Sequence, residues 1–371
     1  MWHNPPILIK ALLSPKSIEQ FSIPDWELCI RQARSSQLLV RLAITLREHS
    51  LENSVPRPAL KHLVAAVVHY EHLRNAVRNE VAYLSEALKS IDVPLVLLKG
   101  AAYELGGLRP ARCRLFNDID LLVPKVRIEV VELSLLLHGW ASMQQDAYDE
   151  RYYRTWMHEI PPLRHLTRLS VVDVHHNIVP DTGSIKVAPD NLLKNIHSCP
   201  SNPDVFVLSN QDMILHSAVH LFNDGEFDHG LRDLLDIRDL IHELICTESE
   251  WNLLISRAEE IGLVKPLVYA LRYLDSLFDE PLQTYLDKLS KHSPSKFQFF
   301  VMDFLFLRGL QPDHSSCNDT LTLIARFCLY LRGHALRMPP HLLLPHLMRK
   351  SLMRLRESFF SRREANMPLL P

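Results

Sequence analysis

Two aspartates stand close together in the segment DIDLLV, residues 118–123. If this segment is a strand, the alternation of side chains puts Asp118 and Asp120 on the same face. Two adjacent carboxylates repel each other unless a cation lies between them, and on an apolar strand they are costly without one. Oxygen ligands suit a hard ion such as Mg²⁺, which also binds substrate phosphates. The pair therefore suggests a magnesium site, although a D-x-D pair alone is common at strand ends.

A third acid, Asp173, lies among valines in the segment VVDV, residues 171–174, where a carboxylate is hard to explain structurally. If this strand pairs beside residues 118–123, three carboxylates converge, which suffices for two ions that activate a hydroxyl and stabilise a departing pyrophosphate. His175 should share the same face. It either binds substrate, holds Asp173 in position, or bonds to backbone at the strand end.

The turn at Lys99, Gly100 and Ala101 joins a predicted strand to a helix. Glycine lets the backbone approach a phosphate, and the start of a helix offers free N–H groups. Lys99 and Arg114 could add positive charge for a triphosphate. The competing interpretation of both residues is a solvated loop side chain.

Three motifs occur in order: LLKG at 97–100, R-x-x-x-DIDLLV at 114–123 and VDVHH at 172–176. Together they resemble the uncharacterised nucleotidyltransferase family NTP_transf_5 of the DNA polymerase β-like superfamily, over roughly residues 20–300. The resemblance implies metal ligation by Asp118, Asp120 and Asp173, with two Mg²⁺ ions, or Mn²⁺ in their place. It also implies phosphate contacts near Lys99 and Gly100. The wider superfamily usually has Gly-Ser or Gly-Gly at the turn, so a serine hydroxyl is missing here.

The resemblance implies an enzyme that transfers a nucleoside monophosphate from an NTP to a hydroxyl acceptor. Two alternatives stay open. One is a nucleotidylating toxin or another enzyme that modifies protein or RNA, and the other is a non-catalytic nucleotide-binding scaffold protein. No motif identifies the acceptor, which could be a small molecule, RNA or protein, or the preferred base.

The elements that must position these residues form a short α/β region between helical regions. Apolar residues recur at helical spacing before residue 90 and after residue 189. Strands are predicted over 93–98, 118–123 and 170–178, and helices over 101–105, 128–137, 212–222 and 232–244. We therefore expect an α+β fold, with a small polymerase β-like mixed sheet flanked by N- and C-terminal helical domains. The expected domains are 1–90, 91–182, 183–332 and a basic tail, 333–371.

Two groups of polar residues lie on the later helices. His216 and His220 have a spacing that can bind metal, but no third ligand matches them, so helix packing or a place beside the substrate is favoured. A cluster of charged residues is expected to form ion pairs on a solvated helix face, with one member that could line the nucleotide pocket: Arg232, Asp233, Asp236 and Asp239.

The net charge, the cysteines and the apolar runs of the sequence indicate where the protein acts and what it can bind. The formal charge of -2 gives no overall attraction to nucleic acid or membrane. The six cysteines are scattered without a C-x-x-C pair, which fits a reducing cytosol, and no apolar run approaches about 20 residues. We expect a cytoplasmic protein without a transmembrane segment. The basic, leucine-rich tail either packs on the protein or contacts a membrane, nucleic acid or partner.

Overall fold

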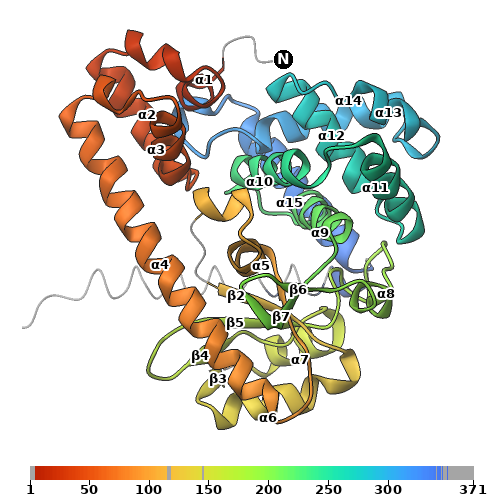
Figure 1. Cartoon of the computed structure of the whole chain (residues 1–371). Coiled ribbons are helices and arrows are strands. Elements are labelled where there is room, and N and C mark those ends of the chain that lie inside the picture. Colours follow the sequence, from red (N-terminus) through yellow and green to blue (C-terminus); the bar gives the residue numbers. More distant parts are fainter. Residues whose placement is uncertain are drawn as a thin grey trace, which may run out of the picture.

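The computed structural model describes residues 5–114, 118–143, 146–339, 341–343, 345 and 349 of the chain. One seven-stranded mixed sheet, in the order β3-β4-β5-β2-β1-β7-β6, lies in the lower half of Figure 1, below the N-terminal and the C-terminal helices. This arrangement confirms the predicted α+β class, a mixed sheet flanked by N- and C-terminal helices.

The middle of the sheet consists of β5, β2, β1 and β7. Strand β2 pairs parallel with β5 and antiparallel with β1, and β1 pairs parallel with β7. All four residues of β1 are buried, as expected for a strand covered on both faces. The strands are β1 (Leu95–Leu98), β2 (Asp118–Leu122), β3 (Trp140–Ser142), β4 (Leu163–His165), β5 (Val171–His175), β6 (His197–Cys199) and β7 (Asn202–Val207).

The three predicted strands are confirmed as β1, β2 and β5, each with slightly shorter bounds. The sheet also takes β6 and β7 from beyond residue 182, a region for which the sequence predicts helices. Short strands such as β6, with only three residues, carry too few alternating positions to be detected by periodicity.

The N-terminal helices are α1 (Ile7–Leu13), α2 (Ile23–Ser35), α3 (Leu39–Glu48) and α4 (Arg57–Lys89). Helix α4 is 33 residues long and runs from this group down along the side of the sheet (Figure 1). Its C-terminal part packs against α5 (Lys99–Gly106), α6 (Ile128–Leu137) and β1. The Ser134 hydroxyl of α6 donates a hydrogen bond to the Ala87 carbonyl of α4 at 2.6 Å. This long helix therefore joins the N-terminal group to the sheet.

The C-terminal helices pack around α9, which contacts α10, α11, α12 and α15. Serine or threonine caps the start of α9, α11 and α14 with a side-chain oxygen that accepts a backbone N–H, as is typical of N-caps. The remaining helices are α7 (Ala147–Trp156), α8 (Pro189–Leu193), α9 (Asn210–Asn223), α10 (Gly230–Leu244), α11 (Glu248–Glu260), α12 (Val264–Phe278), α13 (Gln283–Lys288), α14 (Lys296–Gly309) and α15 (Thr322–Arg337).

Arg232, Asp236 and Asp239 of α10 are buried and Asp233 is half-buried, so the prediction that these residues lie on a solvated helix face was wrong. Asp236 and Asp239 are 1% and 3% exposed, and both accept hydrogen bonds from Arg41 of α3, at 3.0 and 2.7 Å. The partner lies almost 200 positions away in the sequence, which is why the local pattern on α10 could not reveal the burial.

The C-terminal region is only partly described. Helix α15 continues through residue 333 and ends at Arg337, whereas residues 350–371 of the expected basic tail lie outside the described residues. Within the part of the chain that the structure describes, no helix has the length and apolar character needed to span a bilayer.

Candidate active site

The three aspartates predicted as a metal site lie on two adjacent parallel strands. Asp120 of β2 and Asp173 of β5 are direct partners in the ladder, and Asp118 stands two residues before Asp120 on the same face. Asp120 is 4% exposed, Asp173 is half-buried and Asp118 is exposed at the start of its strand. The parallel pairing therefore brings all three carboxylates to one region of the sheet.

Lys99 reaches this region from the junction between β1 and α5. Its φ angle is +46°, a left-handed conformation that costs a residue with a side chain about 1–2 kcal/mol. Because Leu98 pairs with Asp120 across the β1–β2 ladder, the next residue lies beside the same carboxylate. Lys99 Nζ donates a hydrogen bond to Asp120 Oδ1 at 2.9 Å. Gly100 and Ala101 are buried in the first turn of α5.

His175 lies between two carboxylates. Its Nε2 is 2.9 Å from Asp120 Oδ1, and its Nδ1 is 3.2 Å from Glu159 Oε2. The histidine predicted to share the face of Asp173 therefore contacts Asp120 directly. Glu159 was missed in the sequence, because a His-Glu dipeptide ahead of two prolines matches no metal or catalytic spacing.

The charges around Asp120 divide the carboxylates into two kinds. Burial would raise the pKa of Asp120, but Lys99 and His175 hold it well below its usual range. Burial and the negative charge of Asp120 instead raise the pKa of Asp173 to about 7. Desolvation and the same negative charge raise the pKa of Asp118. Positive groups thus balance the negative charge of Asp120, whereas the ionised forms of Asp118 and Asp173 are disfavoured.

Asp173 also has an unpaired oxygen. Its Oδ1 is buried and makes no hydrogen bond within the described structure. Such an atom normally has a partner, and a carboxylate oxygen next to two further acids is a suitable donor for a hard divalent cation. The residues present therefore fit a magnesium-type ion.

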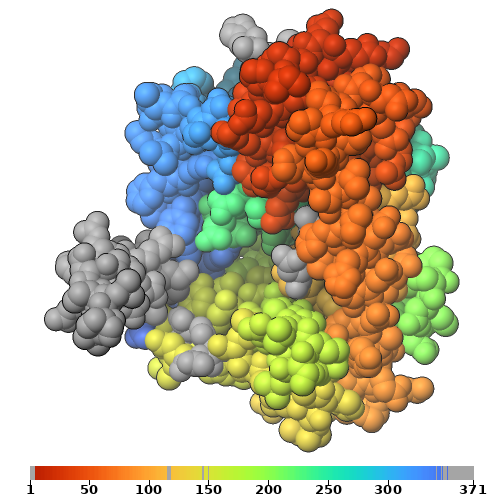
Figure 2. Space-filling model, turned by 90° about the vertical axis from the view of Figure 1, so that its left-hand side faces the viewer, coloured from red at the N-terminus to blue at the C-terminus, as the bar shows by residue number. Residues whose placement is uncertain are grey.

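A cavity of about 220 Å³ opens beside Asp173, Lys99 and His175. Its other walls come from the segment 157–159, from residues 178–185, from α9 through Val219, His220 and Asn223, and from the end of α15. In the space-filling view, the surface is hollowed where the sheet region meets the helices above it (Figure 2). The cavity is therefore built by the sheet and the C-terminal helices together.

Arg114 lies away from this cavity. Its Nη1 pairs with Asp233 and Asp236 of α10, at 3.2 and 2.6 Å, and its side chain is 14% exposed. Burial alone would lower the pKa of Arg114, but the two aspartates raise it. Its charge also acts on Asp118, where it lowers the pKa. A direct contact with phosphate stays a prediction.

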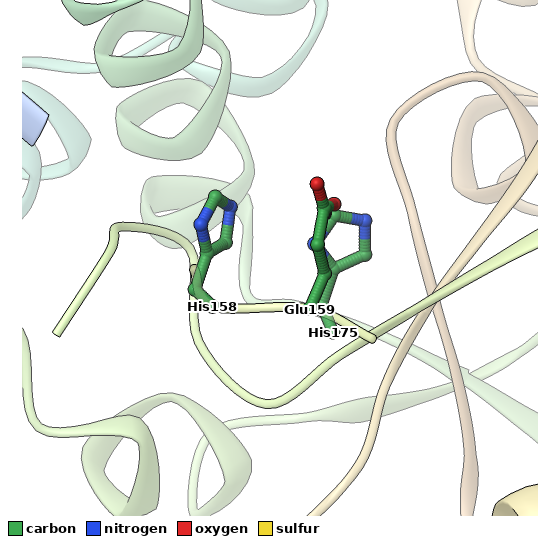
Figure 3. A group of neighbouring side chains, drawn as sticks. All are labelled: His158, Glu159 and His175. Atoms are coloured by element: carbon green, nitrogen blue, oxygen red, sulfur yellow. Dashed lines mark ion pairs between the residues drawn. The ribbon is translucent and has the colours of Figure 1, made fainter. Parts of the chain in front are cut away.

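Among the described residues, no third metal-type ligand forms a group with His216 and His220. Burial and the positive charge of Lys99 lower the pKa of His216 to about 3, so the buried ring is neutral. His220 lines the cavity. Among the residues that the structure describes, one group of three metal-type ligands lies within 4.8 Å: His158, Glu159 and His175 (Figure 3).

The chain is thus an α+β protein whose mixed sheet gathers carboxylates from adjacent strands beside a helix-covered cavity. The chain belongs to the family described as "Uncharacterised nucleotidyltransferase", whose model matches residues 22–279. No match was found among curated proteins.

Two solved structures are similar to the chain. One is the solution structure of the antibiotic-resistance factor ANT(2'')-Ia, with 15% identity, a TM-score of 0.30, and coverage of 48% of this chain and 89% of that one. The other is the crystal structure of an antigenic nucleotidyltransferase-like protein from Paracoccidioides brasiliensis, with 16% identity, a TM-score of 0.33, and coverage of 57% and 92%. At these scores neither likeness bears on the activity of the chain.

Proposed function

We propose that this protein is a Mg²⁺-dependent nucleotidyltransferase, which transfers a nucleoside monophosphate from an NTP to a hydroxyl acceptor and releases pyrophosphate. The observation that carries the proposal is the pairing of Asp120 with Asp173 across two parallel strands, with Asp118 on the same face. Membership of a nucleotidyltransferase family supports the same class of reaction.

Asp118 and Asp120 of β2 and Asp173 of β5 are the residues that would hold the divalent cations, Mg²⁺ or Mn²⁺. Bound ions of this kind polarise an attacking hydroxyl and neutralise the charge that develops on a departing pyrophosphate. The donor set supports this assignment because it consists of oxygens alone and includes the unpaired Asp173 Oδ1.

Lys99 is suited to bind the triphosphate. Its Nζ carries a positive charge at the wall of the cavity, and although burial would lower its pKa, Asp120 raises it. The strained backbone at Lys99 leads directly into the buried first turn of α5, where Gly100 and Ala101 lie. Phosphate contacts through Lys99, Gly100 and Ala101 therefore remain part of the proposal.

Asp173 is suited to accept the proton of the acceptor hydroxyl. A general base works best when its pKa lies near the operating pH, and in the ion-free protein the pKa of Asp173 is raised to about 7, from which a bound cation would lower it. Its second carboxylate oxygen, Oδ2, would take the proton while Oδ1 holds a cation. His175 acts as a positioning residue, because its Nε2–H holds Asp120 at 2.9 Å.

The test uses the full chain with each of four α-labelled NTPs, Mg²⁺, and small-molecule, RNA and protein acceptors. We expect pyrophosphate release and label transfer, lost on removal of divalent ions and reduced at least about a hundredfold by Asp118→Asn or Asp173→Asn. Asp204→Asn, at an exposed acid of β7, is the matched control and should retain the wild-type rate.

The label identifies the acceptor class, since a protein- or RNA-modifying enzyme would label a macromolecule. Turnover that is unchanged in both aspartate variants would falsify the proposed site. NTP binding without any turnover across the acceptor panel would instead indicate a scaffold protein.

A further inference from the structure

A short backbone segment beside β5 holds two side chains against His175. The His176 N–H donates to the His158 carbonyl at 2.8 Å, and the Ile160 N–H donates to the Val174 carbonyl at 3.0 Å. Glu159 and His175 form an antiparallel bridge between these two bonds. Directly opposite residues in such a pair send their side chains to the same side. The positions of Glu159 and His175 are therefore set by backbone pairing.

The three side chains project in the same direction from the backbone, with Glu159 and His175 overlapping in the view and His158 beside them (Figure 3). One possible ligand atom from each of His158, Glu159 and His175 lies within 4.8 Å of the others, and the rings of the two histidines are 5.3 Å apart. His175 Nδ1 and Glu159 Oε2 are separated by 3.2 Å. Two ligands bound tetrahedrally to one ion at about 2.0–2.1 Å lie about 3.3 Å from each other, so this separation suits a zinc-type site.

The hydrogen bond to Asp120 orients His175 for ligation. A histidine that binds a metal usually donates its other ring N–H to a carboxylate, and here Asp120 Oδ1 lies 2.9 Å from Nε2. With the proton on Nε2, the lone pair of Nδ1 faces the Glu159 oxygen. At this distance either a proton on Nδ1 or a bound cation would lie between the two atoms, so a metal ion can take the place of that proton.

The surrounding charge and space also suit a cation. The negative charges of Glu159 and Asp120 act on His175 against the positive charge of Lys99, and Arg337 lines the same cavity. His158 and Glu159 are half-buried, and both line the cavity together with His175. An ion held by three protein ligands would thus keep a coordination position open toward the cavity, as in catalytic zinc sites.

We propose that His158, Glu159 and His175 form a binding site for a divalent transition-metal ion of the zinc type, separate from the three-aspartate site. Two imidazoles and one carboxylate suit Zn²⁺ or Co²⁺, whereas Mg²⁺ prefers oxygen donors. The ion would fix His175 and, through its Nε2–H, the position of Asp120. This site extends the proposed function and does not depend on it.

The test measures metal binding by the full chain after treatment with a chelator. Zn²⁺ is titrated in competition with a chromophoric chelator, and Co²⁺ is added separately to record its visible absorption bands. We expect one equivalent to bind the wild type and raise its unfolding temperature. Glu159→Gln, which keeps the shape of the side chain, and His158→Ala should each weaken binding at least about tenfold.

Two controls make the result specific. His197→Ala removes an exposed histidine of β6, and Asp118→Asn removes a residue of the three-aspartate site, so both should keep the zinc affinity and the cobalt spectrum. Circular dichroism of each metal-free variant checks its folding. Absence of binding, or wild-type affinity in both Glu159→Gln and His158→Ala, would overturn the assignment.

The two proposals fail separately. NTP turnover in Mg²⁺ without zinc uptake would remove only the transition-metal site. Zinc uptake that depends on His158 and Glu159, without any NTP turnover, would remove only the nucleotidyl transfer.

Discussion

At the scale of single residues, Asp120 is the point around which the other polar groups are arranged. It receives hydrogen bonds from Lys99 and His175, and it lies opposite Asp173 in the β2–β5 ladder. Because its negative charge is compensated within the protein, Asp120 stays ionised. Asp173, its partner in the ladder, makes no hydrogen bond to a cationic side chain among the described residues. Burial and the charge of Asp120 therefore make its ionised form unfavourable.

Replacement of Asp173 by asparagine should therefore stabilise the metal-free fold. The pKa of Asp173 is raised from 3.8 to about 7, so the folded state binds more protons than the unfolded chain between these values, and its contribution to stability falls as the pH rises. At pH 8 without divalent ions, we expect Asp173→Asn to raise the free energy of unfolding by roughly 2 kcal/mol. This is less than the pKa difference alone would give, because the side chain is only half-buried.

Urea unfolding at pH 8 and at pH 4 measures this effect, which should shrink toward the lower pH. Asp204→Asn is the control for a general effect of removing one negative charge. A variant less stable than the wild type at pH 8 would contradict the charge assignment. Gain of stability together with loss of activity is the pattern expected of a functional residue.

His216 should make the protein sensitive to mild acid. Burial and Lys99 lower its pKa from 6.5 to about 3, so the unfolded chain takes up a proton at pH 5 and the folded protein does not. Its contribution to stability is complete above pH 6.5 and falls as the pH decreases toward 3. Between pH 7.5 and 5.0, the wild type should lose on the order of 2 kcal/mol more stability than His216→Gln.

Urea midpoints at several pH values test this difference. His197→Gln, at an exposed histidine of β6, should lose as much stability on acidification as the wild type. Identical pH profiles for His216→Gln and the wild type would show that this ring is not buried in its neutral form.

At the scale of elements, the site depends on how separate segments are joined. Asp236 of α10 accepts hydrogen bonds from Arg41 of α3 and from Arg114, which precedes β2. One carboxylate thus connects an N-terminal helix, a C-terminal helix and the segment that leads into β2. Buried pairs of this kind contribute little net stability, but removal of one partner leaves an uncompensated charge.

Asp236→Asn should destabilise the protein by about 2 kcal/mol, because each arginine loses one of two carboxylate partners and keeps the other, Asp239 or Asp233. Glu52→Gln, in the exposed pair with Arg47, is the matched control and should change the free energy of unfolding by less than about 1 kcal/mol. The free energies come from urea unfolding in the presence of a chelator. Equal effects of the two substitutions would show that the α3–α10 connection is not buried in solution.

At the scale of the whole molecule, the cavity is shared between the sheet and the C-terminal helices. Asp173 and His175 come from β5, whereas His220 comes from α9 and Leu336 and Arg337 come from the end of α15. The long helix α4 runs along the sheet and packs against α5, α6 and β1 (Figure 1). Substrate contacts are therefore expected from residues that are far apart in the chain.

The sequence alone determined which strands carry the acids and that helices flank the sheet. Side-chain alternation places Asp118 and Asp120 on one face, and valines around Asp173 mark a buried strand, because these features depend only on neighbouring residues. The motifs at 97–100, 114–123 and 172–176 likewise identified the family, whose model matches residues 22–279.

Only the tertiary structure decided which distant groups meet. The β2–β5 register sets Asp120 opposite Asp173, the bridge beside β5 brings Glu159 to His175, and α10 binds Arg114. None of these contacts follows from local spacing, because backbone pairing and helix packing join segments whose separation along the chain carries no pattern. The three aspartates could therefore be named from the sequence, whereas their register and the His158–Glu159–His175 group appeared only in the folded chain.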